Sequence, residues 1–309
     1  MRTRRAALAV SGGTLLSALA GCLGEPVEED GTGVRVVATL FPFYDFARRV
    51  AADDDRVETL VPPEVQGHGW EPSADVQRRA HDADVFVYPG PGVQRWADAI
   101  VENLRTDSPD VVVVAASEGV DLLPASATGG GGETDPHFWL DPTLAARAVR
   151  NVRDGVLAAD AGDRTAYRRS VEAYLDRLRD VDTAFSERLA ARRTNVVVVA
   201  GHDAYRYMAR RYGFEVVSPV GVAPDAVPDP RAIRRVQRVV AEHDLEYVLA
   251  PALESDRLAR EIARETGTEV LPISPVAGQT SEWAASDWGY IEQMLRVNLP
   301  SLATALGAG

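Results

Sequence analysis

A long amphipathic run at Asp163–Arg193 is the feature that most constrains the fold of this chain. Its apolar residues recur at helical spacing, as Val171, Leu178 and Leu189 illustrate. About thirty residues of α-helix reach ~45 Å at 1.5 Å per residue, which is enough to cross one domain or to brace two. On both sides of the run, short apolar segments alternate with helical ones. Such alternation predicts parallel sheets with right-handed crossover helices.

The alternation divides into two similar halves. The strands expected before the long run are Val34–Leu40, Val57–Val61, Asp84–Tyr88 and Val111–Ala115, and those expected after it are Asn195–Ala200, Phe214–Val217, Glu246–Ala250 and Glu269–Pro272. A final helix is expected over Asp287–Leu306. The predicted fold class is α/β, with two parallel-sheet α/β lobes joined by one long bracing helix. The predicted boundaries are 34–160 for the first lobe, 161–193 for the linking helix and 194–309 for the second lobe.

The first residues resemble a targeting segment. Three arginines open residues 1–21, and the apolar run that follows is too short and too broken by glycine for a membrane span. Leu19-Ala20-Gly21-Cys22 matches a lipoprotein signal, in which the cysteine is lipidated and becomes the new N-terminus. Cys22 is the only cysteine of the chain, so its thiol is interpreted as an anchor rather than as half of a disulfide. Residues 22–33 would then form an acidic tether.

This interpretation predicts an exported protein anchored to the outer face of the cell membrane. The export route stays open, because Thr3-Arg4-Arg5 resembles an abbreviated twin-arginine signal while a Sec route fits equally well. Cleavage would remove three arginines and no acidic residue, so the net charge of −13 would become −13 − 3 = −16.

The charge balance limits the partners. All 33 basic residues are arginine, against 46 carboxylates. An acidic, lysine-free surface suits a halophilic protein, since concentrated salt screens the repulsion between its charges. A GC-rich genome would explain the missing lysine but not the acidity. Nucleic acid is not expected as a partner, because duplex binding needs a basic face.

Three of the five histidines lie in comparable places. His68, His137 and His202 each occupy a loop that follows a predicted strand and precedes a helix, where parallel α/β sheets bind their ligands. Two belong to the first lobe and one to the second, so facing lobes would bring the three imidazoles together across a cleft between the lobes. Imidazole suits zinc and other late first-row divalent ions. His81 and His243 end predicted helices and are interpreted as structural.

Three sequence motifs surround these histidines. They are Val61-Pro62-Pro63 with His68-Gly69-Trp70-Glu71-Pro72-Ser73, then Asp135-Pro136-His137-Phe138-Trp139-Leu140-Asp141-Pro142, then Gly201-His202-Asp203-Ala204-Tyr205 followed by Tyr212-Gly213. The three motifs resemble the ligand loops of the zinc and manganese receptors of ABC importers. They occur in the family's order. The resemblance implies two α/β lobes joined by one long helix, with His68, His137 and His202 as the metal ligands.

The resemblance also implies a function. The family delivers a divalent metal to a membrane permease that is powered by a cytoplasmic ATPase. A histidine at the third ligand position accompanies zinc and a glutamate there accompanies manganese, so Zn²⁺ is the expected cargo, with Mn²⁺ or iron as the alternative. The protein is expected to be a monomer and not an enzyme.

The sequence departs from the family pattern in two places. The family often supplies an aspartate as a fourth ligand near the last strand of the second lobe, whereas Leu271-Pro272-Ile273-Ser274-Pro275 places Ser274 there. Serine is a poor zinc ligand, so either a water completes the site or a carboxylate such as Glu71 or Glu254 joins it. The family's histidine-rich loop is also missing, because residues 127–133 contain four glycines and no histidine.

Carboxylates near the histidines are candidates to orient the imidazoles. A ligating imidazole usually donates its other N–H to a carboxylate or a carbonyl, and Asp135, Asp141 and Asp203 are the nearest in sequence. Helix capping is the favoured interpretation for Asp141 and an equal alternative for Asp203, ahead of a helix at 204–212. For Glu71, a cap or a salt bridge is favoured over ligation.

Two other classes of function fit parts of the pattern. Three histidines and a water also form a hydrolytic zinc site, with Glu71 as the nearest candidate base, but neither His-Glu-x-x-His nor Gly-x-Ser-x-Gly occurs in the sequence. A receptor for a metal chelate or a vitamin could share the two-lobe architecture, because a fold does not fix a ligand.

Overall fold

The computed structural model describes residues 33–51, 56–65, 70–125, 134–160, 164–222 and 228–308. The predicted targeting segment, Cys22, His68 and the glycine-rich residues 127–133 lie outside the described residues. Gly33–Gly309 forms one unit. Within the part that the structure describes, none of the helices combines the length and the apolarity that crossing a bilayer requires.

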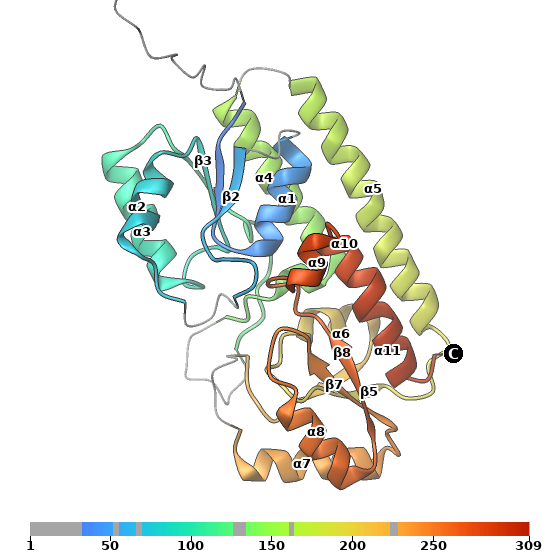
Figure 1. Cartoon of the computed structure of the whole chain (residues 1–309). Coiled ribbons are helices and arrows are strands. Elements are labelled where there is room, and N and C mark those ends of the chain that lie inside the picture. The colour runs from blue at the N-terminus through green and yellow to red at the C-terminus, as the bar shows by residue number, and fades with distance from the viewer. Residues whose placement is uncertain are drawn as a thin grey trace, which may run out of the picture. The chain divides into compact units, whose positions relative to one another are not determined.

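The described residues of the first lobe contain a four-stranded parallel sheet (Figure 1). Its strands are β1 (Val36–Ala38), β2 (Val57–Thr59), β3 (Val85–Tyr88) and β4 (Val112–Ala115), in the order β2-β1-β3-β4. Val36 pairs with Val57 on one side and Val85 on the other. β1 and β3 are fully buried, as expected of valine-rich strands covered on both faces.

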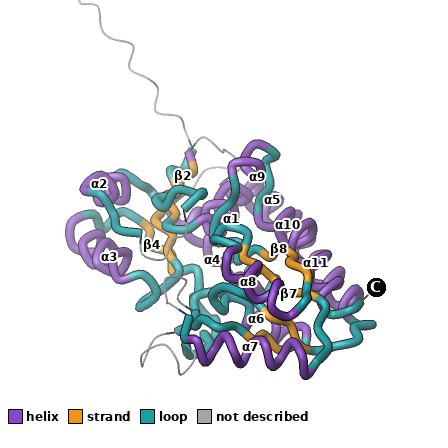
Figure 2. The backbone as a smooth tube through the Cα atoms, turned by 60° about the horizontal axis from the view of Figure 1, so that its bottom comes forward, coloured by secondary structure: helices purple, strands orange, loops and turns teal. Residues whose placement is uncertain are grey.

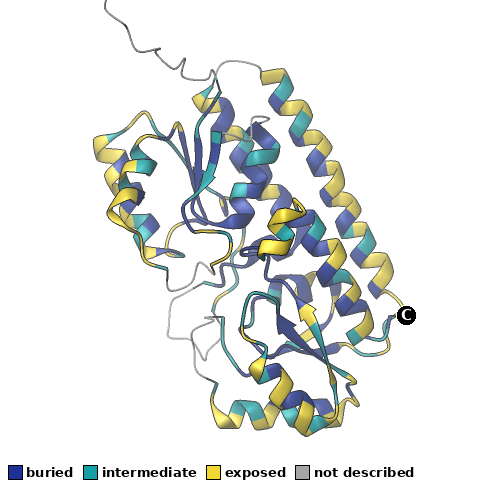
Figure 3. Cartoon of the chain, viewed as in Figure 1, coloured by how far each residue is buried: buried dark blue, intermediate teal, exposed yellow. Residues whose placement is uncertain are grey.

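Helices cover both faces of this sheet. They are α1 (Phe41–Ala51), α2 (Ala74–His81), α3 (Arg95–Asp107) and α4 (Pro142–Ala159). The two-residue period of a strand sends Val85 and Val87 to the core that α1 and α4 complete, and Phe86 and Tyr88 to the core beneath α2 and α3. Figure 3 shows the resulting buried layers between exposed helix faces.

The long helix α5 (Arg164–Leu189) confirms the bracing element that the sequence predicts. Its 26 residues span ~39 Å. It packs against α1 and α4 of the first lobe and against α6, α10 and α11 of the second. The buried stripe comprises Tyr167, Val171, Tyr174, Leu175, Leu178, Val181, Phe185 and Leu189. One helix therefore shares its apolar face between the two lobes.

The second lobe repeats the strand order of the first. Its strands are β5 (Val196–Val198), β6 (Glu215–Val217), β7 (Tyr247–Pro251) and β8 (Glu269–Ile273), and its helices include α6 (Arg206–Tyr212), α7 (Pro230–Glu242) and α8 (Arg257–Thr266). β5 pairs with β6, and β7 pairs with β8. Among the described residues, one isolated bridge between Val199 and Leu249 joins β5 to β7, which gives the order β6-β5-β7-β8. α7 and α8 pack on one face of this array (Figure 2).

The closing helix predicted over Asp287–Leu306 is present but begins at Tyr290. It consists of α10 (Tyr290–Gln293), a π-helical turn η3 (Met294–Asn298) and α11 (Leu299–Ala305), which follow one another without a break, and the short helix α9 (Ser281–Ala285) precedes it. Asp287 has a positive φ of 50°, which an α-helix does not allow. Pro300 has no N–H to donate to the preceding turn, and the widened turn lies just before it.

Candidate metal centre

His137 lies in a turn that its own neighbour Asp135 organises. Oδ1 of Asp135 accepts a hydrogen bond from the backbone N–H of His137 (3.0 Å) and a second from the imidazole Nδ1 (2.9 Å). Both side chains are fully buried. Because Oδ1 is the acceptor, Nδ1 carries the proton and Nε2 holds the lone pair that a metal ion would take.

Burial also sets the charge of His137. Desolvation lowers the pKa of the imidazole, and the hydrogen bond and charge of Asp135 oppose part of that shift. The imidazole is therefore neutral at neutral pH, which is the form that ligates a metal ion.

Backbone and side-chain groups of the second lobe hold the loop that carries His137. The indole Nε1 of Trp139 donates to the carbonyl of Pro275 (2.9 Å), and the hydroxyl of Tyr290 donates to the carbonyl of Trp139 (2.7 Å). The hydroxyl of Tyr207 donates to the carbonyl of Asp135 (2.9 Å). Both lobes thus position the loop. Sequence reasoning missed Tyr207 and Tyr290, since no spacing rule connects residues 72 and 151 positions apart.

His202 lies at the carboxyl end of β5 and is held by a residue that follows β7. Its Nδ1 is hydrogen-bonded to Oε1 of Glu254, and only 1% of the residue is exposed. β5 and β7 are the strands between which the strand order reverses, which is where open parallel sheets bind ligands. A Cβ on Gly201 would lie 2.7 Å from Cδ of Pro251, so only glycine allows the chain to reach this position.

The two described imidazoles converge from different lobes. The ring centroids of His137 and His202 lie 5.2 Å apart, and the ring planes are tilted by 44°. A metal ion bound to an imidazole nitrogen at about 2.1 Å lies ~3.2 Å from the ring centroid, so tetrahedral ligation puts two ring centroids ~5 Å apart. The observed separation therefore fits two ligands of one ion.

The third predicted ligand, His68, lies outside the described residues. Trp70, just after it, packs edge-on against Trp96 with centroids 5.1 Å apart. Within the described ranges, no group of three histidine, cysteine, aspartate or glutamate side chains has the arrangement of a metal site. The described part of the site is thus a pair of imidazoles with their carboxylates.

The remaining candidates occupy different places. Glu71 is exposed, and Ser274 is fully buried with its Oγ donating to Oε1 of Gln293 (2.6 Å). Asp141 caps α4 by accepting from the backbone N–H of Thr143 (2.8 Å), which confirms the capping interpretation.

Asp203 does not cap the helix that follows it, because α6 begins at Arg206 with Tyr205 as its N-cap; that interpretation is wrong. Burial, together with the nearby charge of Asp135, raises the pKa of Asp203 to about 6. The carboxylate hydrogen-bonded to His202 is that of Glu254.

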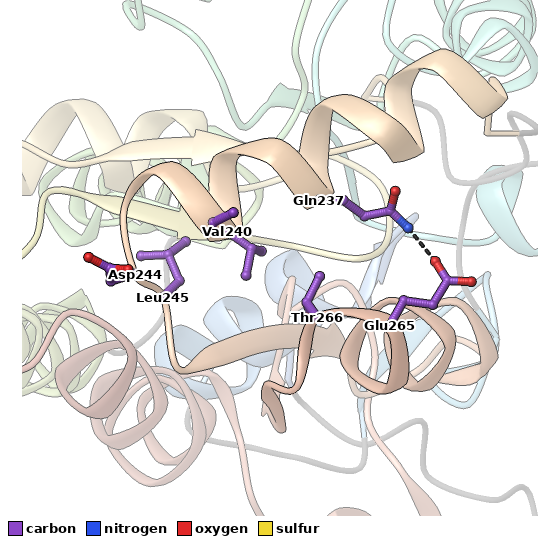
Figure 4. Close-up of a pocket in the computed structure, with 7 residues that line it drawn as sticks. Gln237, Val240, Asp244, Leu245, Glu265 and Thr266 are labelled. Atoms are coloured by element: carbon purple, nitrogen blue, oxygen red, sulfur yellow. Dashed lines mark hydrogen bonds between the residues drawn. The ribbon is translucent and has the colours of Figure 1, made fainter.

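The hollow shown in Figure 4 is separate from the histidines. It lies between α7 and α8 and is lined by Gln237, Val240, Ala241, Asp244, Leu245, Glu265 and Thr266. Gln237 and Glu265 are hydrogen-bonded across it. Neither His137 nor His202 contributes to its lining, so it is not part of the candidate metal centre.

The fold and the converging imidazoles define the class of protein, a two-lobe solute-binding receptor for a metal ion. The family model described as zinc-uptake complex component A, periplasmic, matches residues 36–305. The chain belongs to this family, whose members are metal-binding receptors of ABC importers and not enzymes.

Individual relatives agree with the family. The chain is 27% identical to the high-affinity zinc uptake system protein ZnuA of Bacillus subtilis, over 90% of this chain and 89% of that protein. It is 28% identical to the zinc-binding lipoprotein AdcA of Streptococcus pneumoniae, over 87% of this chain but only 55% of AdcA. It therefore spans about half the length of AdcA.

Solved structures share the two-lobe fold. The metal-dependent lipoprotein YcdH of Bacillus subtilis superposes with a TM-score of 0.77 at 27% identity, covering 88% of this chain and 99% of YcdH. The Zn(II)-bound ZnuA-like domain of Streptococcus pneumoniae AdcA superposes with a TM-score of 0.77 at 29% identity, covering 89% of this chain and 99% of that domain.

Proposed function

We propose that this protein captures a zinc ion and delivers it to an ABC-type importer, made of a permease and its ATPase. One observation carries the proposal: His137 and His202 converge from opposite lobes with ring centroids 5.2 Å apart, and a carboxylate holds Nδ1 of each. In that arrangement the Nε2 lone pairs are the proposed ligands, and a cargo held between them would be released by a separation of the lobes.

The proposed ligands are His68, His137 and His202, with a water in the fourth position. The hydroxyl of Ser274 is hydrogen-bonded to Gln293 and to the backbone N–H of Val276 (3.0 Å), which supports its exclusion as a ligand. The hydrogen bond between Glu254 and Nδ1 of His202 supports a role for Glu254 in orienting this imidazole rather than in ligation. The exposure of Glu71 likewise supports leaving it out of the set.

Zinc is preferred over manganese because the proposed protein donors are all imidazole nitrogens, and over iron because the named relatives bind zinc. Mn²⁺ favours carboxylate, carbonyl and water oxygens, whereas imidazole suits zinc. Relatives named as zinc-binding proteins, and the Zn(II)-bound domain of AdcA, support the same choice.

The proposal extends to the location of the protein. Residues 1–21 would direct export, Cys22 would carry the lipid anchor and residues 22–33 would tether the receptor to the outer face of the cell membrane. The receptor would act as a monomer in a halophilic setting, with lobes at 34–160 and 194–309 around the linking helix at 161–193. The homologue named a zinc-binding lipoprotein supports the anchor.

Elemental analysis of the full chain, purified without added metal, tests the cargo. We expect one zinc per chain, and we expect zinc to displace manganese in competition calorimetry. Retention of manganese in the presence of equimolar zinc would contradict the assignment. Mass spectrometry of the membrane fraction, comparing wild type with Cys22→Ser, tests the anchor, because a diacylglycerol-sized mass increase should be present only in wild type.

A further inference from the structure

Residues 274–279, which we call the strap, follow β8 and lead into α9. Each of them is buried, although they form a connection rather than a helix or strand. Connections normally run over the surface, because their backbone groups need hydrogen-bond partners. The partners of the strap therefore indicate why this connection is inside the protein.

The outer side of the strap contacts the two segments of the first lobe that lead to or contain a proposed ligand. The backbone N–H of Gln279 donates to the carbonyl of Pro63 (2.8 Å), in the segment after β2. The carbonyl of Pro275 accepts from Nε1 of Trp139 (2.9 Å), two residues after His137. A Cβ on Gly278 would overlap the carbonyl oxygen of Pro63, so the two backbones approach as closely as glycine permits.

The inner side of the strap is fixed by three fully buried polar side chains. Oγ of Ser274 donates to Oε1 of Gln293 (2.6 Å), and Nε2 of Gln293 donates to the carbonyl of Gly278 (3.0 Å). Asn298 is the third of these side chains. Its Oδ1 accepts from the backbone N–H of Ser274 (2.7 Å), and its Nδ2 donates to the Ser274 carbonyl (2.9 Å). These bonds fix the strap at position 274 and again at position 278.

The network also accounts for the widened turn before α11. Asn298 lies in the π-helical turn η3, and Gln293 immediately precedes it. Such turns are rare and often occur at functional sites, because they re-aim side chains that a regular helix would point elsewhere. Here the amides of Asn298, in the turn, and of Gln293, just before it, both bond to the strap, where a buried amide must find partners for both of its ends.

We propose that Ser274, Gln293 and Asn298 are positioning residues for metal capture, acting through the strap on the loop of His137. The inference rests on the proposed function, since the cargo site is the one described above. Ser274 acts by holding the backbone that supports Trp139 and, through it, the direction of the His137 imidazole.

The test compares Ser274→Ala with Ser301→Ala, a second buried serine of the same lobe that lies outside the network. We expect Ser274→Ala to weaken zinc binding about tenfold, in the range seen when supporting groups of a metal site are removed. We also expect it to change the visible absorption of the Co²⁺-loaded protein, which reports ligand geometry. Ser301→Ala should change neither. Unchanged affinity and spectrum in folded Ser274→Ala would overturn the proposal.

A double-mutant cycle tests the route through the strap. Trp139→Phe removes the donor to Pro275 and keeps a ring in place. If Ser274 acts through Trp139, the loss in zinc affinity for the double variant should be smaller than the product of the two single losses. Strict additivity would exclude this route. Should Ser274→Ala fail to fold, Asn298→Asp tests the same network, because it loses the donation from Nδ2 to the strap.

The outcomes separate this inference from the proposed function. A wild-type protein that binds no zinc, or a His137→Ala variant with full affinity, would contradict the proposed function itself. A wild type that binds zinc through its histidines, beside an unaffected Ser274→Ala variant, would contradict only the positioning role.

Discussion

The two lobes share a strand order, yet each holds its histidine in a different way. In the first lobe, His137 is held by Asp135, two residues earlier in the same turn. In the second, His202 is held by Glu254, which is 52 residues away and reaches it only because β5 and β7 are neighbours. One arrangement is local and the other is a product of topology.

The difference extends to the surroundings. The His137 loop is fixed by partners from the opposite lobe, including Pro275, Tyr290 and Tyr207. His202 depends instead on the close approach of Gly201 to Pro251 within its own lobe. Variants in the first lobe should therefore report on contact between the lobes, and variants in the second should report on the packing of one sheet.

The largest expected effect comes from removing either imidazole. His137→Ala and His202→Ala should each weaken zinc binding by orders of magnitude, because each removes a proposed direct ligand. Calorimetry measures the loss. His243→Ala is the control. His243 is exposed at the end of α7, so this variant should bind zinc with the affinity of the wild type. Full affinity in either ligand variant would remove that residue from the site.

The next effect concerns the two carboxylates. Asp135→Asn and Glu254→Gln each keep an oxygen for Nδ1 but lose the charge, and loss of such support costs about 10–100-fold in metal affinity. We expect the larger loss for Asp135→Asn, because Asp135 is fully buried whereas 19% of the Glu254 side chain is exposed. Competition with a chelator of known affinity gives both values. A larger loss for Glu254→Gln would show that zinc binding depends less on the Asp135–His137 contact than on the Glu254–His202 contact.

A smaller effect is expected from Gly201→Ala. The added methyl group would meet Pro251 and press toward Oε2 of Glu254, at 3.0 Å. Overpacking of this kind costs about 1–3 kcal/mol of stability, and zinc affinity should fall several-fold with it. Gly267→Ala is the matched control. It strains a positive φ of 76° at the end of α8, so denaturant titration should show lost stability while calorimetry shows unchanged zinc affinity.

The smallest effect is a slope of stability with pH. Burial lowers the pKa of His137 in the folded protein, so the imidazole takes up a proton near pH 6.5 in the unfolded chain but only at lower pH in the folded protein. The free energy of unfolding of the metal-free protein should therefore be highest above pH 6.5. It should fall as the pH drops toward the pKa of His137 in the folded protein, by up to about 1.4 kcal/mol per pH unit. His137→Gln should flatten this slope in urea titrations at several pH values. A flat wild-type profile would contradict the lowered pKa of His137.

The sequence predicts the local features of this fold well. The valine runs locate β1 to β4, and the apolar spacing from Val171 to Leu189 locates α5, because both signals lie within one element. The cap by Asp141 and the loop placement of His137 and His202 have the same origin. Each follows from residues that are neighbours along the chain.

The features that the sequence does not predict depend on distant partners. The start of the closing helix at Tyr290 is an example. It follows Gly289, where a Cβ would lie 2.8 Å from Oδ2 of Asp45, a residue of α1. The role of Ser274 is another, since it depends on Gln293 and Asn298 in a turn that only the folded chain brings close. Glu254 could be named as a candidate, but its pairing with His202 requires knowing that β5 adjoins β7.

The carboxylates beside the two imidazoles give the interior a charge that matches its proposed cargo. The carboxylates of Asp135 and Glu254 are hydrogen-bonded to the imidazoles, and that of Asp203 lies near Asp135. Arg206 is the nearby cation and pairs with Asp135 at 3.7 Å, so three carboxylates stand against one guanidinium. A bound divalent cation would therefore balance this excess of two negative charges, whereas a monovalent ion would leave the region negative. Since an uncompensated charge in a protein interior is costly, we expect the proposed site to favour divalent over monovalent ions before it distinguishes one divalent metal from another.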